Sequence, residues 1–427
     1  MMGYAQMVSE DYFPLLRDEY TIYVQPHGNL LYSSKVGDIV AYLNDDAVKI
    51  ISYCDGNHKV QDIANPFDEG CDTARRVVRD FFESSVKLFE YRSKTKERRR
   101  DPIVIGQGSP TLIKANIEIT SQCNLRCSYC LNSCAASRHD ELNCDDWLAV
   151  IDLLKSKGVR SLVFTGGEPF TKKFFWKILE SAVKNFDVAV LTNGFFLRDL
   201  GQRRAQLLKE TKRIQISVDS HDPARHDRHR GRGSWKRAME AVKLLKSLGI
   251  WVETSTVILP EDNEEELRRT KEFLEGLGVD KVIMEPVEVR GRAYSLGIQR
   301  TLFYAQVKDY QNRKLLPTLD DGYSYGGQCL FKLGVVAIRP NGYLKYCPLP
   351  DEIFEFWYPN LTKTDRYQDL ATKDLTDLEL YKLLKTSERQ PNAPVCIECP
   401  LFSSVCPGGC SVAPRFLSDR KICKIGR

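Results

Sequence analysis

The 427-residue sequence predicts an α/β protein whose central part is a parallel sheet of six strands, either curled or open. Short β-branched runs alternate there with amphipathic helical stretches, such as 145–158 and 235–249, which end in glycine as helices often do. Strand–helix repetition of this kind places the strands parallel and side by side. The expected strands are 112–120, 160–166, 188–193, 213–219, 251–258 and 281–287.

The first 100 residues have the pattern of a small separate domain. Segments 21–24 and 29–34 predict a β-hairpin that turns at His27–Gly28. Three helices are expected after it, and the charged, proline-containing stretch 92–102 then resembles a linker. A hairpin with three helices is a winged-helix outline. The expected helices are 47–51, capped by Asn44 or Asp45, then 60–64 and 72–89.

Composition excludes some classes of protein. Hydrophobic residues make up 42% and charged residues 28%, as in ordinary soluble domains. No apolar run approaches the roughly 20 residues of a membrane helix, and the first 20 residues lack a signal-peptide pattern. The formal charge of +5 is small and dispersed. We therefore expect a cytoplasmic location, with neither a membrane nor a nucleic acid as partner.

The 14 cysteines are the informative anomaly, because in such a chain they favour metal ligation over disulfides. Cys54 and Cys71 stand apart, and we expect buried structural thiols there. Cys134 and Cys144 fit no motif; they are either plain loop thiols or residues that contact substrate or shuttle protons. The remaining cysteines form two groups, one after the first central strand and one between Cys329 and the C-terminus.

The first group is Cys123-x-x-x-Cys127-x-x-Cys130, directly after the strand that ends at Thr120. Three thiolates leave one iron of a four-iron cubane without a protein ligand, so that iron is free to bind a small molecule. The structural alternatives are a zinc-binding loop or a chance cluster of cysteines. The position at the carboxyl end of a strand, where such sheets bind ligands, favours the cluster.

Three further strand ends carry polar or glycine-rich segments. Gly166-Gly167-Glu168-Pro169 permits close backbone approach and offers a carboxylate to an ammonium group, although such a segment alone is usually a turn. Ser217 and Asp219 are among the last residues of the predicted strand 213–219. The alternative there is that they only hydrogen-bond to the end of the strand. Thr192-Asn193-Gly194 is as compatible with a simple turn as with a ligand contact. Arg230 and Arg232 are likewise as compatible with an exposed basic loop as with a site.

Together these segments resemble the radical S-adenosylmethionine superfamily, whose signature CxxxCxΦC has an aromatic at Tyr129. The resemblance implies a partial (β/α)6 barrel in which Cys123, Cys127 and Cys130 hold a [4Fe–4S] cluster. The open iron would bind the methionine part of S-adenosylmethionine, and reduction would give a 5′-deoxyadenosyl radical. The other cofactor contacts implied are Tyr129, Gly166, Gly167, Glu168, Asn193, Ser217, Asp219 and Arg230.

The C-terminal cysteines resemble the SPASM domain, which houses two auxiliary clusters. One spacing is a residue longer than the commonest form. The resemblance implies an outer cluster on Cys396, Cys399, Cys406 and Cys423, and an inner cluster on Cys329, Cys347 and Cys410. Seven ligands leave the inner cluster with an open iron, and zinc ribbons are the alternative. Three domains are thus expected, over residues 1–100, 101–315 and 316–427.

The N-terminal pattern resembles the PqqD-like domain that captures a leader peptide as an added strand. A DNA-binding winged helix is the rival, but segment 73–84 is not notably basic. The resemblances imply an enzyme that crosslinks a ribosomally made precursor peptide, with a flavodoxin- or ferredoxin-type electron donor. A cysteine thioether is the first expectation and a carbon–carbon bond the second. Sulfatase maturation and a non-catalytic iron–sulfur or DNA-binding regulator are further alternatives.

Overall fold

The computed structural model forms two compact units, Met1–Pro110 and Thr111–Arg427, and each is described by itself. The first unit extends past the domain boundary that the sequence predicts at residue 100, and the three-domain division remains a prediction. The structure describes residues 11–25, 28–63, 72–95, 101–105, 111–198, 200–289, 291–299, 306, 309, 334–345, 365–373 and 375–378.

The first unit contains the predicted hairpin. Strands β2 (Tyr20–Gln25) and β3 (Gly28–Ser33) pair antiparallel, with Gln25 opposite Gly28. Strand β4 (Asp38–Leu43) continues the sheet beside β3, and β6 (Ile103–Ile105) pairs parallel with the other side of β2. The segment expected to be a linker therefore leads into a sheet strand. A separate ribbon pairs β1 (Phe13–Leu16) with β5 (Phe89–Arg92).

Three helices of the first unit confirm the sequence pattern, but the third ends early. Helix α1 (Asp45–Ser52) is capped by Asn44, whose Oδ1 accepts from the Ala47 amide at 2.7 Å. Helices α2 (Val60–Ile63) and α3 (Asp72–Ser84) follow. The predicted continuation of α3 to Phe89 is wrong. The hydroxyls of Ser84 and Ser85 bond back to the Phe81 carbonyl, and a 3-10 turn, η2 (Val86–Leu88), leads into β5.

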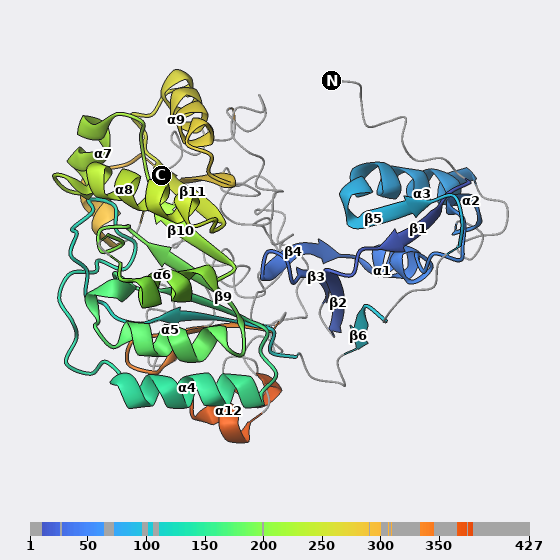
Figure 1. Ribbon diagram of the computed structural model, residues 1–427, viewed down its shortest axis with the longest axis horizontal. Coiled ribbons are helices and arrows are strands. Elements are labelled where there is room, and N and C mark those ends of the chain that lie inside the picture. The colour runs from blue at the N-terminus through green and yellow to red at the C-terminus, as the bar shows by residue number, and fades with distance from the viewer. Residues whose placement is uncertain are drawn as a thin grey trace, which may run out of the picture. The chain divides into compact units, whose positions relative to one another are not determined.

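The second unit is built on the predicted six parallel strands, which lie in chain order (Figure 1). The strands are β7 (Lys114–Glu118), β8 (Ser161–Thr165), β9 (Asp187–Thr192), β10 (Arg213–Ser217), β11 (Val252–Ile258) and β12 (Lys281–Pro286). Because all six run in one direction, their carboxyl ends share one edge of the sheet.

Helices connect these strands (Figure 1). The apolar side chains of all of them except the polar helix at 223–230 form the core with one face of the sheet. The largest fully buried side chains of this core include Trp147, Phe164 and Phe175, and the last two rings meet at 5.3 Å. Each such side chain stabilises the fold by about 1.5–3 kcal/mol through burial. The helices are α4 (Cys144–Ser156), α5 (Phe175–Val183), α6 (Gln202–Lys209), α7 (Pro223–Arg230), α8 (Ser234–Ser247) and α9 (Glu264–Gly276).

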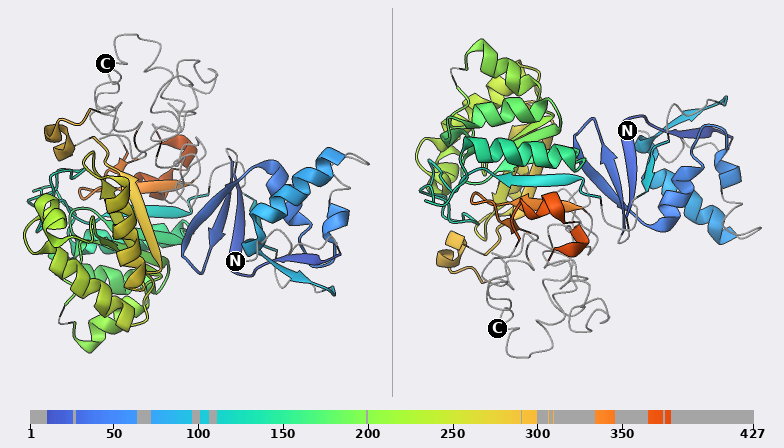
Figure 2. Two further views of the ribbon diagram at one scale, coloured as in Figure 1. Left: turned by 90° about the horizontal axis from the view of Figure 1, so that it is seen from above. Right: turned by 90° about the horizontal axis from the view of Figure 1, so that it is seen from below.

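The sheet has two more strands than the six that the repeats predict. Strand β13 (Val335–Ile338) pairs parallel with β7, and β14 (Leu344–Lys345) pairs antiparallel with β13 (Figure 2). Their residues belong to the segment assigned to the third domain. Two short elements, α12 (Asp369–Thr372) and η6 (Leu375–Asp377), follow. In the part of the chain that the structure describes, no helix has the length and apolar character needed to cross a bilayer.

Candidate functional site

The three cysteines of the CxxxCxxC motif lie in the loop that follows β7, and all three are half-buried. The Cys123 amide donates to the Ala135 carbonyl at 2.9 Å, which closes the loop on itself. The Ser128 amide donates to the His229 carbonyl at 2.8 Å, which fixes the middle of the loop to the end of α7. The protein backbone thus holds the loop on two sides.

The thiols differ in acidity. Burial raises the pKa of Cys123 to about 11, and the carboxylate of Glu168 adds to the rise. Burial also raises the pKa of Cys127, against the opposing charges of Arg230 and Arg292. A hydrogen bond from Cys134 lowers the pKa of Cys130 to about 6. Because a metal binds the thiolate form, loading this loop must release protons, chiefly from Cys123 and Cys127.

The donor set of the loop fits an iron–sulfur cluster better than a single ion. Among the described residues, no three His, Cys, Asp or Glu side chains converge closely enough to hold one metal ion. A cubane does not require such convergence, because each thiolate binds a different iron. Three soft sulfur donors at half-buried positions on one loop therefore fit a [4Fe–4S] group.

Two glycines allow the next strand end to approach this loop. A Cβ atom at Gly166 would lie 2.5 Å from the Thr120 carbonyl oxygen, and Gly166 has a φ of +124°. A Cβ at Gly167 would lie 2.2 Å from the carbonyl oxygen of Gln122, the residue before Cys123. Two hydrogen bonds hold the backbones together: the Gly167 amide donates to the Thr120 carbonyl, and the Glu168 amide donates to the Gln122 carbonyl. Only glycine fits at these two positions.

Glu168 is fully buried and joins two strand ends. Its carboxylate accepts from the Thr192 hydroxyl and from the Asn193 amide, each at 2.8 Å, and also caps the short turn η3 (Pro169–Thr171). Burial raises the pKa of Glu168 to about 7. Asn193 extends the connection to the cysteine loop, because its Nδ2 donates to Asn124 Oδ1 at 2.9 Å and lies 3.9 Å from Cys123 Sγ.

Asp219 and Arg230 form a buried ion pair beside Tyr129. The guanidinium donates to both carboxylate oxygens, at 2.7 and 2.8 Å, and lies over the Tyr129 ring at 5.5 Å. The Tyr129 hydroxyl and the Val257 amide also donate to Asp219. Burial acts to raise the pKa of Asp219, but the charge of Arg230 outweighs it and the pKa falls. Ser217 ends β10 with a half-buried side chain, opposite Ser255 of β11.

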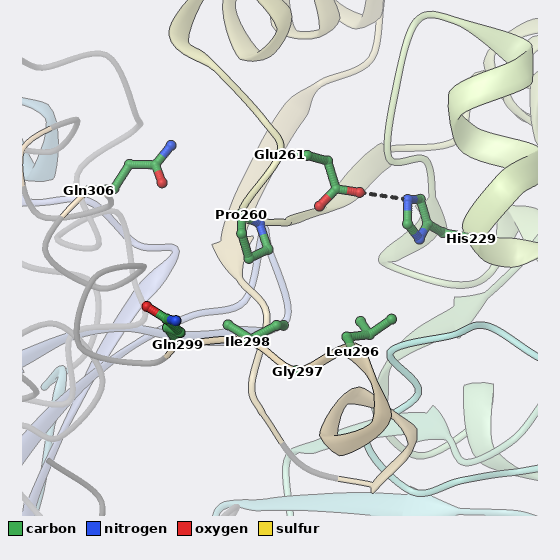
Figure 3. Close-up of a pocket in the computed structure, with 8 residues that line it drawn as sticks. All are labelled: His229, Pro260, Glu261, Leu296, Gly297, Ile298, Gln299 and Gln306. Atoms are coloured by element: carbon green, nitrogen blue, oxygen red, sulfur yellow. Dashed lines mark ion pairs between the residues drawn. The ribbon is translucent and has the colours of Figure 1, made fainter. Parts of the chain in front are cut away.

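A pocket of about 490 Å³ lies beside this group, at the carboxyl ends of β11 and β12 (Figure 3). His229 connects it to the cysteine loop: its Nδ1 lies 3.0 Å from the Ser128 hydroxyl, and its Nε2 lies 2.9 Å from a Glu261 carboxylate oxygen. The pocket wall thus has one imidazole–carboxylate contact and is otherwise lined by apolar or amide groups. Its lining residues are His229, Pro260, Glu261, Leu296, Gly297, Ile298, Gln299 and Gln306.

Two features of the site were missed by the sequence analysis. Glu141 accepts hydrogen bonds from the side chains of Thr120, Ser121 and Ser137 and forms an ion pair with Lys172 at 3.0 Å. Despite its burial, these donors lower the pKa of Glu141. Gly291 and Arg292, in the turn η4 (Gly291–Leu296) after β12, contact the cysteine loop. The strand-end rule that found the other segments points to this turn as well, but nothing local distinguishes Arg292.

The cysteines outside the motif divide into two sets. Cys54 is buried, as expected, and its thiol donates to the Ile50 carbonyl. Cys134 is also buried, beside Cys130, whereas Cys144 is half-buried at the start of α4. The other predicted positions lie outside the described residues; they are Cys71, Cys329, Cys347, Cys396, Cys399, Cys406, Cys410 and Cys423.

Comparisons with known proteins agree with this geometry. Residues 117–274 match the family model of the radical SAM superfamily. The chain is 24% identical to the antilisterial bacteriocin subtilosin biosynthesis protein AlbA of Bacillus subtilis (strain 168), over 95% of this chain and 93% of that protein. It is 33% identical to the sporulation killing factor maturation protein SkfB of the same strain, over 36% of this chain and 38% of that protein.

A solved structure shows the same fold. The crystal structure of Streptococcus suis SuiB bound to the precursor peptide SuiA aligns with a TM-score of 0.54 at 15% identity, over 94% of this chain and 97% of that chain. The matched residues 117–274 contain the three motif cysteines, Glu168, Asp219 and Arg230. The chain is therefore an enzyme with a radical SAM domain, the type of domain that binds S-adenosylmethionine and a [4Fe–4S] cluster.

Proposed function

We propose that this enzyme matures a ribosomally made precursor peptide by joining a cysteine sulfur to a carbon of the same peptide. The observation that carries the proposal is the similarity to the subtilosin biosynthesis protein, which covers 95% of the chain and so includes both compact units. An enzyme sharing only the radical domain would match over residues 117–274 and not over the N-terminal unit.

We assign the cluster to Cys123, Cys127 and Cys130. The bound cluster and S-adenosylmethionine together supply a carbon-centred radical that removes a hydrogen atom from the substrate. The chain's own contribution is to hold the loop at the sheet edge, and the Gly166–Gly167 contact and the Asn193–Asn124 bond support that role.

We assign the cofactor contacts to Tyr129, Gly166, Gly167, Glu168, Asn193, Ser217, Asp219 and Arg230. Glu168 suits the amine of the cofactor's methionine, because an ammonium group nearby relieves the cost of burying its carboxylate. Asp219 already accepts from Arg230, Tyr129 and Val257. Its main task in this assignment is therefore to hold the Arg230 guanidinium and the Tyr129 ring in place.

We propose that the N-terminal unit binds the leader part of the precursor as an added strand. Of the two outer sides of the β2–β3–β4 meander, the side of β2 is covered by β6 from Ile22 to Val24. Strand β4 is the last strand on the other side in the described part of this sheet. Its edge therefore suits main-chain pairing with an extended peptide.

The remaining assignments concern the C-terminal cysteines and the partners. We propose that the seven C-terminal cysteines hold two auxiliary [4Fe–4S] clusters, with an outer set of four ligands and an inner set of three. The inner cluster would then have an iron free for the substrate thiolate, and either cluster would accept the surplus electron. A flavodoxin- or ferredoxin-type donor in the cytoplasm would supply the reducing electron.

The test is to produce the chain together with candidate precursor peptides and to measure the peptide mass. The proposed thioether removes a pair of hydrogen atoms and leaves the joined cysteine unreactive toward a thiol alkylating agent. The same mass change with every cysteine still reactive would mean a carbon–carbon crosslink instead. An unchanged mass with every leader-bearing peptide, from an enzyme that cleaves S-adenosylmethionine, would contradict the proposal.

A further inference from the structure

Arg292 contacts the cysteine loop, although the two segments follow strands at opposite ends of the run of six parallel strands. It belongs to the turn after β12, whereas the loop follows β7. Its backbone amide donates to the Cys130 carbonyl at 3.1 Å, and its Nε donates to the Cys127 carbonyl at 2.8 Å. Its Nη1 donates to the Cys134 carbonyl at 2.9 Å. One residue thus binds three carbonyls of the loop, and two of them belong to motif cysteines.

The residue before it is shaped to allow this contact. Gly291 has a φ of +53°, and a Cβ atom there would lie 2.3 Å from the Leu131 carbonyl oxygen and 2.4 Å from that of Cys130. The backbone of the turn therefore lies directly against the backbone of the loop. Any side chain at Gly291 would push the two apart and stretch the bonds made by Arg292.

Arg292 also brings a fixed positive charge to the loop. A guanidinium group carries this charge in proteins. The guanidinium donates to the carbonyls of Cys127 and Cys134, so its charge lies directly against the loop that carries the motif thiols. Reduction of a cluster on these thiols adds one further negative charge, which a nearby cation stabilises.

We infer that Arg292 is a positioning residue for the radical cluster with two effects: its hydrogen bonds hold the three-cysteine loop, and its charge raises the reduction potential of the cluster. The inference rests on the assignment of a cluster to Cys123, Cys127 and Cys130. It does not depend on which peptide is modified.

Three variants of the full-length enzyme separate the effect on loop geometry from the effect on the reduction potential. Arg292→Gln removes the charge and the planar guanidinium that donates to two carbonyls, whereas Arg292→Lys keeps the charge and loses the planar group. Gly291→Ala keeps the arginine but forces the turn away from the loop. Gly297→Ala is the matched control, because Gly297 has a φ of +63° in the same segment but no atom lies within 4 Å of the place that its Cβ would take.

Each variant is reconstituted anaerobically and titrated with dithionite while the reduced clusters are followed by electron paramagnetic resonance. The signal that changes when S-adenosylmethionine is added reports the cluster of the motif cysteines. Signals that do not change serve as an internal reference. Iron retention during incubation with a chelator measures how firmly the loop holds its cluster.

We expect Arg292→Gln to lower the ratio of reduced to oxidised cluster at a given applied potential on the order of tenfold, which is a shift of about 59 mV for a one-electron couple. Arg292→Lys should keep most of the potential but lose iron faster, and Gly291→Ala should lose iron faster than Gly297→Ala. An unchanged potential and unchanged iron loss in Arg292→Gln would overturn the inference, as would a wild type without a signal responsive to S-adenosylmethionine. A wild type with that signal but no peptide product would count against the proposed function alone.

Discussion

Gly167 offers a substitution whose effect follows from one close backbone contact. A Cβ atom at this position would lie 2.2 Å from the carbonyl oxygen and 2.6 Å from the carbonyl carbon of Gln122. Both atoms are backbone, so no side chain can rotate away, and Gln122 directly precedes Cys123. Gly167→Ala must therefore shift the cysteine loop relative to β8.

The size of the effect follows from the cost of forcing an extra methyl group into packed atoms, about 1–3 kcal/mol. If that cost appears as a loss of the loop geometry that binds S-adenosylmethionine, its affinity falls between about fivefold and 150-fold. Calorimetric titration of the reconstituted enzyme measures this affinity, and thermal melting measures any part of the cost that appears as stability.

The matched control is Gly276→Ala, at the end of α9, where no atom lies within 4 Å of the new Cβ. That change should leave affinity unaltered and should stabilise the helix by up to about 1 kcal/mol. Equal affinities for Gly167→Ala and Gly276→Ala, with equal melting temperatures, would refute the account of the contact between β8 and the cysteine loop.

Further predictions concern three buried groups. In the apo protein, the carboxyl of Glu168 has a pKa of about 7 in the folded state and near 4.5 in the unfolded state. The folded state therefore binds this proton more tightly, and the free energy of unfolding should fall by on the order of 3 kcal/mol as pH rises from 4.5 to above 7. Glu168→Gln should flatten the plot of melting temperature against pH over this range. An unchanged slope would contradict the raised pKa of Glu168. Asp219→Asn leaves Arg230 buried without its charge partner and should lower the free energy of unfolding by about 3–5 kcal/mol, measured by denaturant unfolding. The control is the exposed ion pair between Glu180 and Arg203, where Glu180→Gln should lower it by less than about 1 kcal/mol. Trp147→Ala, at a fully buried position in α4, should cost about 3–5 kcal/mol, and a loss below about 1 kcal/mol would show that the helix does not pack on the sheet as described.

The repeating elements could be predicted because their signals are local. The six strands of the second unit, the β2–β3 hairpin and the Asn44 cap each depend on a few neighbouring residues. Phe89 shows the limit of that reasoning. It continues the apolar spacing of α3, yet it lies in β5, where its ring packs against Phe82 at 5.3 Å. Helical spacing cannot distinguish a longer helix from a strand that returns to the same core.

The placement of the candidate site residues at one sheet edge was predictable where they belong to a motif. Cys123, Glu168 and Asp219 lie at strand ends, and a parallel sheet brings strand ends to one edge. The turn at Arg292 lies 162 residues beyond Cys130 in the numbering, and its bonds are made to carbonyls, which every residue carries. The pairing of β13 with β7 joins residues still further apart in sequence, since Val335 lies opposite Lys114. Such contacts leave no pattern in the residue types.

The most direct measurement is the anaerobic formation of 5′-deoxyadenosine from S-adenosylmethionine with a strong reductant, quantified by chromatography. The control is the triple variant Cys123→Ala, Cys127→Ala, Cys130→Ala, in which the C-terminal cysteines are intact. The account predicts product from the wild type, alone or once a leader-bearing peptide is added, and none from the triple variant. Equal product from both proteins, or none from an iron-loaded wild type with every candidate peptide, would contradict a radical cluster on these three cysteines.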